Sequence, residues 1–145
     1  MLTSTLYRPV GPGQLQAILE SGGRRFPGRR PNQKFFYPLL HESFARRIAV
    51  EWHLQRSGVG YITAFEVVSA YLHTMPVYTV GGPEHREYRI PARELEAFND
   101  QIVGRISVVG VMVAGAGQVP NRPHWGGLCR MAGSDTVDDV LFAFQ

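Results

Sequence analysis

The first third of the chain carries strand-like and helix-like hydrophobic patterns in turn. Residues 5–10 form a short strand-like run that ends at a Gly-Pro-Gly sequence. Leu15, Ile18 and Leu19 then recur at helical spacing, and this predicted helix ends at the following Ser-Gly-Gly because glycine favours the end of a last turn. The next loop is expected to be flexible and basic, and either to wrap a phosphate-bearing ligand or to be solvated. Its arginines are Arg24, Arg25, Arg29 and Arg30.

The middle of the chain predicts two short strands, a helix and one long strand. Residues 34–38 are a brief aromatic strand. The helix that follows it has a single apolar stripe, formed by Phe44, Ile48 and Trp52. Residues 58–68 alternate most regularly and predict the long strand, with Glu66 on the face opposite to its apolar side chains. After one turn of helix or loop, residues 77–80 predict another short strand.

A Gly-Gly-Pro turn then leads into the run 87–90, in which side chains alternate between two faces. Tyr88 and Ile90 are therefore expected to enter the core. Glu87 and Arg89 are expected to point the other way, which places a carboxylate on a supported strand end. The alternative is an exposed charged loop, since most surface charges are merely solvated.

The last predicted helix and strand of the domain lie between residues 91 and 113. Pro91 suits the first turn of a helix, and this helix is expected to end near Gly104. Its apolar stripe consists of Leu95, Phe98 and Ile102. Residues 105–113 are almost continuously apolar, which is typical of a strand that is covered on both faces, so we expect this strand at the centre of the sheet.

The composition changes after residue 113. Residues 114–133 are rich in Gly, Pro and Asn and predict a linker or irregular cover. Residues 134–145 predict a short amphipathic helix that packs on its own domain or on another chain. Its stripe is Val137, Val140, Leu141 and Phe144. We therefore expect one domain over residues 1–113 and a tail over residues 114–145.

Composition and charge bound the class of protein. The chain has 145 residues, of which 44% are hydrophobic and 19% charged, and these values suit a single globular domain with a substantial core. The net charge of +3 is too small to indicate nucleic-acid binding by itself. The single cysteine, Cys129, fits a reducing compartment. No apolar segment of membrane-spanning length and no leader pattern is present, so a soluble, cytoplasmic protein without a membrane partner is expected.

Familiar catalytic motifs are absent from the sequence. There is no phosphate-binding P-loop and no G-x-S-x-G, and the five histidines lack metal-ligand spacing, which argues against a metal site. The remaining candidates stand at three predicted strand ends, namely Arg8, Tyr37 and Glu87. Tyr37 either offers its ring to a planar ligand or packs in the core, which is the more common role of such a ring.

Several stretches in this order resemble the ADP-ribosyltransferase-like superfamily, and more narrowly the small bacterial ADP-ribosylation/crystallin J1 proteins. The resemblance covers about residues 5–110. It rests on the stretches Leu6-Tyr7-Arg8-Pro9-Val10-Gly11, Phe36-Tyr37-Pro38-Leu39-Leu40, Val80-Gly81-Gly82, Glu87-Tyr88-Arg89-Ile90-Pro91 and residues 94–104. It implies an α+β fold in which a split antiparallel sheet with short flanking helices binds NAD in a cleft.

The resemblance also implies roles for individual residues. Arg8 is expected to contact the nicotinamide half of NAD, Tyr37 to stack on the nicotinamide, and Glu87 to bond the ribose hydroxyl as the catalytic carboxylate. Tyr7 and His85 are further candidates for cofactor binding. Glu84-His85-Arg86 does not reproduce the E-x-E of arginine-directed transferases, so the acceptor stays open, and Glu84 is the alternative catalytic carboxylate.

These residue types suit the chemistry. Cleavage of the bond between nicotinamide and ribose develops positive charge on the sugar, so the site needs a nearby carboxylate and a cation that holds the phosphates. We expect an NAD-dependent ADP-ribosyltransferase or an NAD glycohydrolase. One biological role of such a transferase is that of a toxin. Two alternatives remain: a catalytically silent member of the fold that binds a nucleotide or a partner protein such as a toxin's neutraliser, and an enzyme acting on RNA 2′-phosphate ends through the arginine loop.

Overall fold

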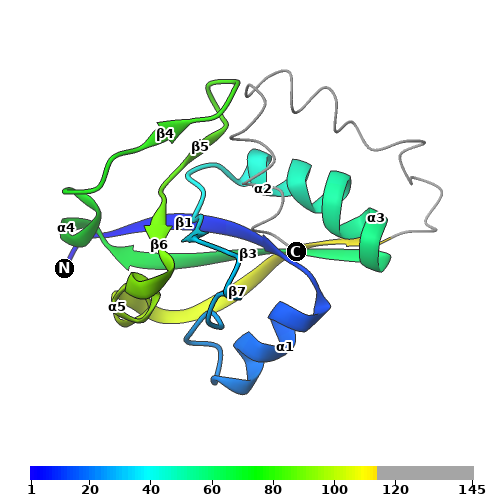
Figure 1. The fold of residues 1–145 in the computed structure, drawn as a ribbon, viewed down its shortest axis with the longest axis horizontal. Coiled ribbons are helices and arrows are strands. Elements are labelled where there is room, and N and C mark those ends of the chain that lie inside the picture. The colour runs from blue at the N-terminus through cyan, green and yellow to red at the C-terminus, as the bar shows by residue number, and fades with distance from the viewer. Residues whose placement is uncertain (114–145) are drawn as a thin grey trace.

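The computed structural model describes residues 1–113, and Figure 1 shows them as a central sheet with helices on both sides. The predicted tail helix over residues 134–145 lies outside the described residues. The elements in chain order are β1 (Thr3–Val10), α1 (Pro12–Glu20), β2 (Phe35–Phe36), α2 (Glu42–Ile48), the π-helical turn η1 (Ala49–His53), α3 (Leu54–Ser57), β3 (Val59–Val68), α4 (Ser69–Leu72), β4 (Tyr78–Thr79), β5 (Arg86–Glu87), β6 (Ile90–Pro91), the 3₁₀ turn η2 (Ala92–Glu94), α5 (Leu95–Asp100) and β7 (Ile102–Val113).

Every strand pairing in the described part of the chain is antiparallel. The main sheet has the order β1-β3-β7, and the shorter pairs are β2-β6 and β4-β5. Two isolated bridges run through one residue: Leu39 pairs with Tyr7 of β1 on one side and with Glu87 of β5 on the other. The α+β class expected from the sequence is confirmed, because antiparallel strands and short helices make up the described domain.

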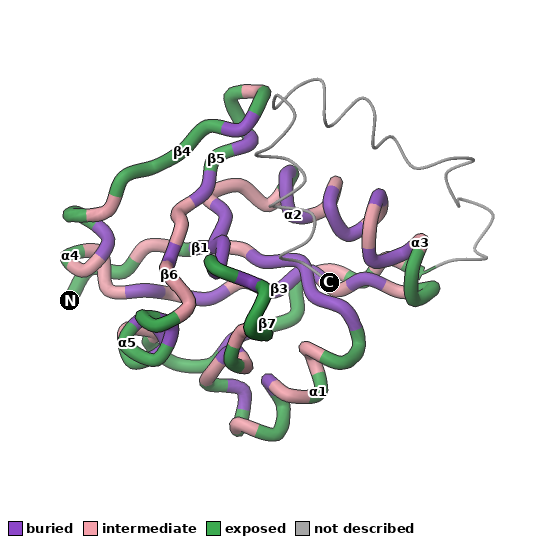
Figure 2. The backbone as a smooth tube through the Cα atoms, viewed as in Figure 1, coloured by how far each residue is buried: buried purple, intermediate pink, exposed green. Residues whose placement is uncertain are grey.

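Side chains that alternate along β1 enter two separate hydrophobic clusters, one on each face of the sheet. The α2-side cluster contains Phe44 and Ile48 of α2 together with Leu39 and Ile62. The α1-side cluster contains Leu6, Val10, Ile18, Phe26, Phe36, Phe65, Val67, Leu72, Ile90, Leu95, Phe98 and Ile106. Figure 2 shows the buried positions gathered in the middle of the molecule, with exposed residues around β4.

The helix over the α2-side cluster is continuous in sequence but changes to a π-helical turn at η1. It packs very closely on β3 at Gly60, where a Cβ atom would lie 3.0 Å from the backbone oxygen of Ala49 and 3.0 Å from Cβ of His53. Glycine at this position therefore permits the approach of helix and strand. The π-helical turn carries Trp52 and His53, and turns of this kind often occur at functional sites.

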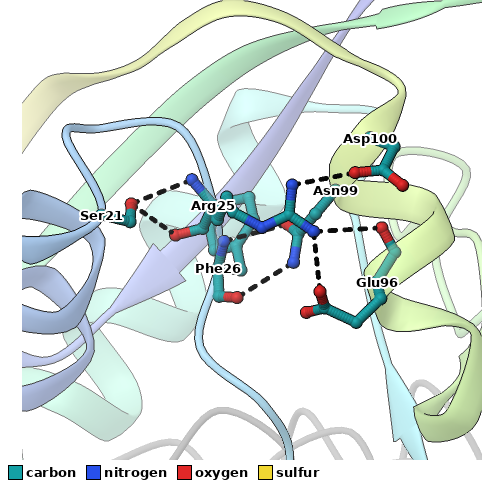
Figure 3. Close-up of polar contacts among 6 residues, drawn as sticks. All are labelled: Ser21, Arg25, Phe26, Glu96, Asn99 and Asp100. Carbon is teal, nitrogen blue, oxygen red and sulfur yellow. Dashed lines mark hydrogen bonds and ion pairs between the residues drawn. The ribbon is translucent and has the colours of Figure 1, made fainter.

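The arginine loop is tied to α5, in contrast to the flexible loop expected from the sequence. The Arg25 guanidinium pairs with Glu96 and Asp100, each at 2.9 Å. Beside it, Asn99 accepts a hydrogen bond from the backbone N–H of Phe26 at 2.9 Å and donates one to its carbonyl at 3.1 Å (Figure 3). Because the Phe26 ring is also buried in the α1-side cluster, residues 25 and 26 anchor this loop.

Three expectations about the helices and strands are wrong. β7 lies at an edge of the β1-β3-β7 sheet, and Val111 and Val113 in it are exposed, because an apolar run does not reveal how many neighbours a strand has. The helix after Pro91 ends at Asp100, and Ile102 begins β7 instead of completing a helical stripe. Leu19 is 64% exposed, so the apolar face of α1 is narrower than predicted.

No helix among residues 1–113 combines the length and the apolar character that a bilayer crossing requires.

Candidate functional site

Arg8 extends from β1 toward the α1 side of the sheet and is only 1% exposed. Its guanidinium lies 4.4 Å from the centre of the Phe36 ring, and Nη1 donates a long hydrogen bond of 3.4 Å to the carbonyl of Tyr37. Burial lowers the pKa of Arg8 well below its ordinary value, and the nearby charge of Arg29 lowers it further. A buried cation therefore sits where β1 meets the segment that holds Phe36 and Tyr37.

A cavity of about 430 Å³ opens at this end of the sheet. Its wall is built from the start of α1, the loop 27–33, and the end of the helix that includes η1 and α3. Three arginines line it, Arg29, Arg30 and Arg56, and no Asp or Glu of residues 1–113 does. We call this cavity the basic pocket. Its charge and its position at the first residues of α1 suit an anionic ligand.

The loop arginines are held in place by backbone contacts. Arg29 donates a hydrogen bond through Nε to the carbonyl of Phe35 at 3.1 Å. Burial lowers the pKa of Arg29 to about 10, while Tyr37 opposes this shift and Arg30 adds to it. The backbone N–H of Arg30 donates to Oε1 of the buried Gln33 at 3.0 Å, which closes the loop against the domain.

His53 contributes a neutral imidazole to the wall of the basic pocket. It is 3% exposed, and its Nε2 has no hydrogen-bond partner among the described residues. Burial lowers the pKa of His53 to about 3, and the charges of Arg8 and Arg56 act in the same direction. Gly11 makes room for the ring, since a Cβ there would lie 3.2 Å from Nδ1. Trp52, the residue before it, supports the Arg56 guanidinium 4.8 Å from its ring centre.

Glu87 is buried on the other face of the sheet. Bridged residues on neighbouring strands direct their side chains to one face, so Tyr7, Leu39 and Glu87 share the α2 side, whereas Arg8 follows Tyr7 and faces the α1 side. The carboxylate is 0% exposed, so the exposed loop considered for this segment is not formed. The alternation predicted for residues 87–90 is confirmed, since Ile90 lies in the α1-side cluster.

One oxygen of the Glu87 carboxylate is paired and the other is not. Oε2 accepts a hydrogen bond from Nε of Arg89 at 2.8 Å, and the Arg89 guanidinium lies 4.0 Å from the centre of the Tyr78 ring. Oε1 has no hydrogen-bond partner within residues 1–113. Burial raises the pKa of Glu87 to about 7 although Arg89 opposes the shift. The group is therefore suited to exchange a proton near neutral pH.

The other predicted ligand contacts lie in the core. Tyr37 is buried in the α2-side cluster, and Tyr7 packs against the same cluster and bonds through its backbone to Leu39. The His85 ring stacks on Phe44 with centres 4.5 Å apart, and its Nδ1 lies 3.2 Å from the carbonyl of Val80. Burial is the main cause of the lowered pKa of His85, and the charge of Arg47 adds to it.

The structure thus joins Arg8 to the backbone of Tyr37 beside the basic pocket and places Glu87 elsewhere. Sequence reasoning identified the arginine loop but missed Trp52, His53 and Arg56. The spacing of Trp52 and Arg56, four residues apart on a helix, was the available signal, because it puts a basic group directly after an apolar stripe. Within residues 1–113, no three His, Cys, Asp or Glu side chains gather as a metal site would require.

Comparisons with protein-family models, with curated proteins and with solved structures found no match.

Proposed function

We propose that this protein binds NAD through its phosphates in the basic pocket and cleaves the bond between nicotinamide and ribose, passing ADP-ribose to an acceptor or to water. The observation that supports this proposal best is the basic pocket itself. Its described lining combines three arginines with no carboxylate, and two of its lining residues, Arg29 and His53, lie close enough to Arg8 to interact with its charge. Arg8 is the residue that the resemblance assigns to the cofactor. Arginine guanidinium groups match phosphate oxygens in geometry and charge.

In this reaction Glu87 would stabilise the positive charge that develops on the ribose. Its position in the structure adds a requirement, because the carboxylate is buried and faces away from Arg8. Turnover therefore needs a rearrangement around residues 80–89 that exposes Glu87 to the bound dinucleotide. The Gly81-Gly82 sequence within this segment supplies backbone freedom, with Gly81 at a positive φ of 91°.

A catalytically silent nucleotide-binding protein is the second candidate. The burial of Glu87 favours this silent protein, because a buried carboxylate bonded to Arg89 has a structural role and does not contact a ligand. The two candidates agree on the ligand and differ only in turnover.

The test is incubation of purified protein with labelled NAD, with and without a cell lysate, and measurement of free nicotinamide and of label transferred. The proposal expects nicotinamide release that Glu87→Gln abolishes, with NAD affinity changed by no more than a few-fold. Glu84→Gln is the matched comparison, since Glu84 is the alternative carboxylate, is exposed and lies three residues away. It should leave turnover intact, and inactivation by Glu84→Gln but not by Glu87→Gln would assign the catalytic role to Glu84. NAD binding without release in any lysate would favour the silent protein, and absence of NAD binding would reject both.

A further inference from the structure

Within residues 1–113, the basic pocket is lined by positively charged side chains and by no carboxylate. Arg29, Arg30 and Arg56 line it, and the buried Arg8 is close enough for Arg29 to lower its pKa. Repulsion among positive charges held close together raises the free energy of the folded protein. An anion that binds between them relieves this repulsion. Because no Asp or Glu among the described residues lines the cavity, an anionic ligand would meet attraction from all three arginines and repulsion from none of the described lining residues.

The buried imidazole of His53 points to the same conclusion independently of charge. A buried polar atom without a partner is unfavourable, and Nε2 of His53 has none among the described residues. Two glycines make space for this residue, Gly11 beside its ring and Gly60 beneath its helix, so the fold accommodates His53 closely. A neutral imidazole has one donor and one acceptor nitrogen, and it bonds a phosphate oxygen without adding another positive charge.

The absence of a carboxylate among the described lining residues narrows the class of ligand. In doubly wound dinucleotide-binding folds an Asp or Glu holds the free ribose hydroxyl and an arginine receives a 2′-phosphate, and the chemical preference of each side chain does not depend on the fold. The described lining of the basic pocket has arginines and no carboxylate, which matches a site for a 2′-phosphate. A phosphomonoester also concentrates close to two negative charges on one group, which suits three converging guanidinium groups better than a singly charged diester does.

We propose that the basic pocket binds the phosphomonoester of a ribose-phosphorylated nucleotide, with charge supplied by Arg29, Arg30 and Arg56 and a hydrogen bond supplied by His53. The inference rests on the proposed function only in taking this pocket as the ligand site, and it names the form of nucleotide that the site prefers. A dinucleotide with a 2′-phosphate is therefore preferred over one without it.

The test compares adenosine 2′,5′-bisphosphate with adenosine 5′-monophosphate by titration calorimetry at about 0.15 M salt. The two probes differ only in the 2′-phosphate, and neither contains a nicotinamide bond. We expect the bisphosphate to bind at least about tenfold more tightly, as a pair of charge-assisted hydrogen bonds allows. Arg30→Gln and Arg56→Gln, both at exposed positions that should not disturb folding, are expected to remove most of this preference. Arg24→Gln, in the same loop but outside the pocket lining, is the matched control and should retain it.

His53→Gln tests the hydrogen bond and should also weaken bisphosphate binding, with thermal unfolding used to verify that the variant is folded. Equal affinity for the two probes, or a preference that survives both arginine substitutions, would overturn the inference. A 2′-phosphorylated RNA oligonucleotide that binds at least about tenfold more tightly than the bisphosphate would overturn the choice of a small nucleotide.

The outcomes also separate this inference from the proposed function. Nicotinamide release from NAD together with equal affinity for the two probes would reject the inference and leave the proposed function standing. An arginine-dependent preference for the bisphosphate in a protein that releases no nicotinamide would reject turnover and leave the inference standing.

Discussion

Arg89 donates a hydrogen bond of 2.8 Å to the fully buried carboxylate of Glu87, two residues earlier in the chain, and this carboxylate has no other hydrogen-bond donor within residues 1–113. Desolvation outweighs the ion pair, because the pKa of Glu87 is raised to about 7 despite Arg89. The ion pair thus orients the carboxylate without keeping it fully ionised at neutral pH.

The first prediction concerns stability and pH. The unfolded chain releases the Glu87 proton near the ordinary carboxyl pKa of 4.5, whereas the folded protein retains it up to a pKa of about 7. The contribution to folding is therefore fully present below pH 4.5 and is lost as the pH rises through 7, by at most about 3 kcal/mol. Urea unfolding of the wild type and of Glu87→Gln should show that the variant becomes relatively more stable between about pH 5 and pH 8. A constant difference across that range would contradict the raised pKa.

The second prediction has the opposite sign and concerns His53. The folded protein keeps this imidazole neutral down to a pKa of about 3, whereas the unfolded chain takes up a proton near 6.5. Stability from this group is present above pH 6.5 and is lost as the pH falls toward 3, by at most about 5 kcal/mol. His53→Asn should therefore lose less free energy of unfolding than the wild type between about pH 7 and pH 4. Parallel acid profiles of the two proteins would show that His53 is accessible to protons in the folded state.

The third prediction tests the close packing at Gly60. Gly60→Ala places a Cβ 3.0 Å from the backbone oxygen of Ala49, so the π-helical turn must move, at a cost of about 1–3 kcal/mol. Gly13→Ala is the control, because a Cβ there meets nothing within 4 Å and alanine favours the helix by about 0.5–1 kcal/mol. Thermal unfolding should show opposite shifts in melting temperature. Equal shifts would mean that the helix adjusts to β3 freely.

The fourth prediction separates the two contacts that anchor the arginine loop. Asn99→Ala removes both partners of the Phe26 backbone, which is buried, and should cost about 1–3 kcal/mol. Arg25→Ala removes ion pairs to the exposed Glu96 and Asp100 and a 3.3 Å hydrogen bond to the carbonyl of Glu96, all at an exposed site, and its effect on the free energy of unfolding should be much smaller. If Arg25→Ala were the more damaging change in a denaturant titration, the loop would be held by charge and not by the buried amide.

Much of the local structure was determined by the sequence. The two-residue period predicted the strands at 5–10 and 58–68, and the structure has β1 and β3 there. The face of each side chain within the run 87–90 was also predictable, because alternation along an extended chain depends on covalent geometry alone. The arginine loop and the strand-end candidates were likewise visible as residue types before their surroundings were known.

The relation between elements was decided only by the tertiary structure. Arg8 and Glu87 lie on opposite faces because of the register in which Leu39 bridges Tyr7 and Glu87, and a shift of one residue would have reversed this. The basic pocket joins side chains from residues 11–17, 27–33 and 52–57, and β7 lies at an edge although its composition suggested the centre. The period of the hydrophobic pattern indicates which side chains share a face of one helix or strand. It does not state which elements become neighbours, because that depends on packing among segments distant in sequence.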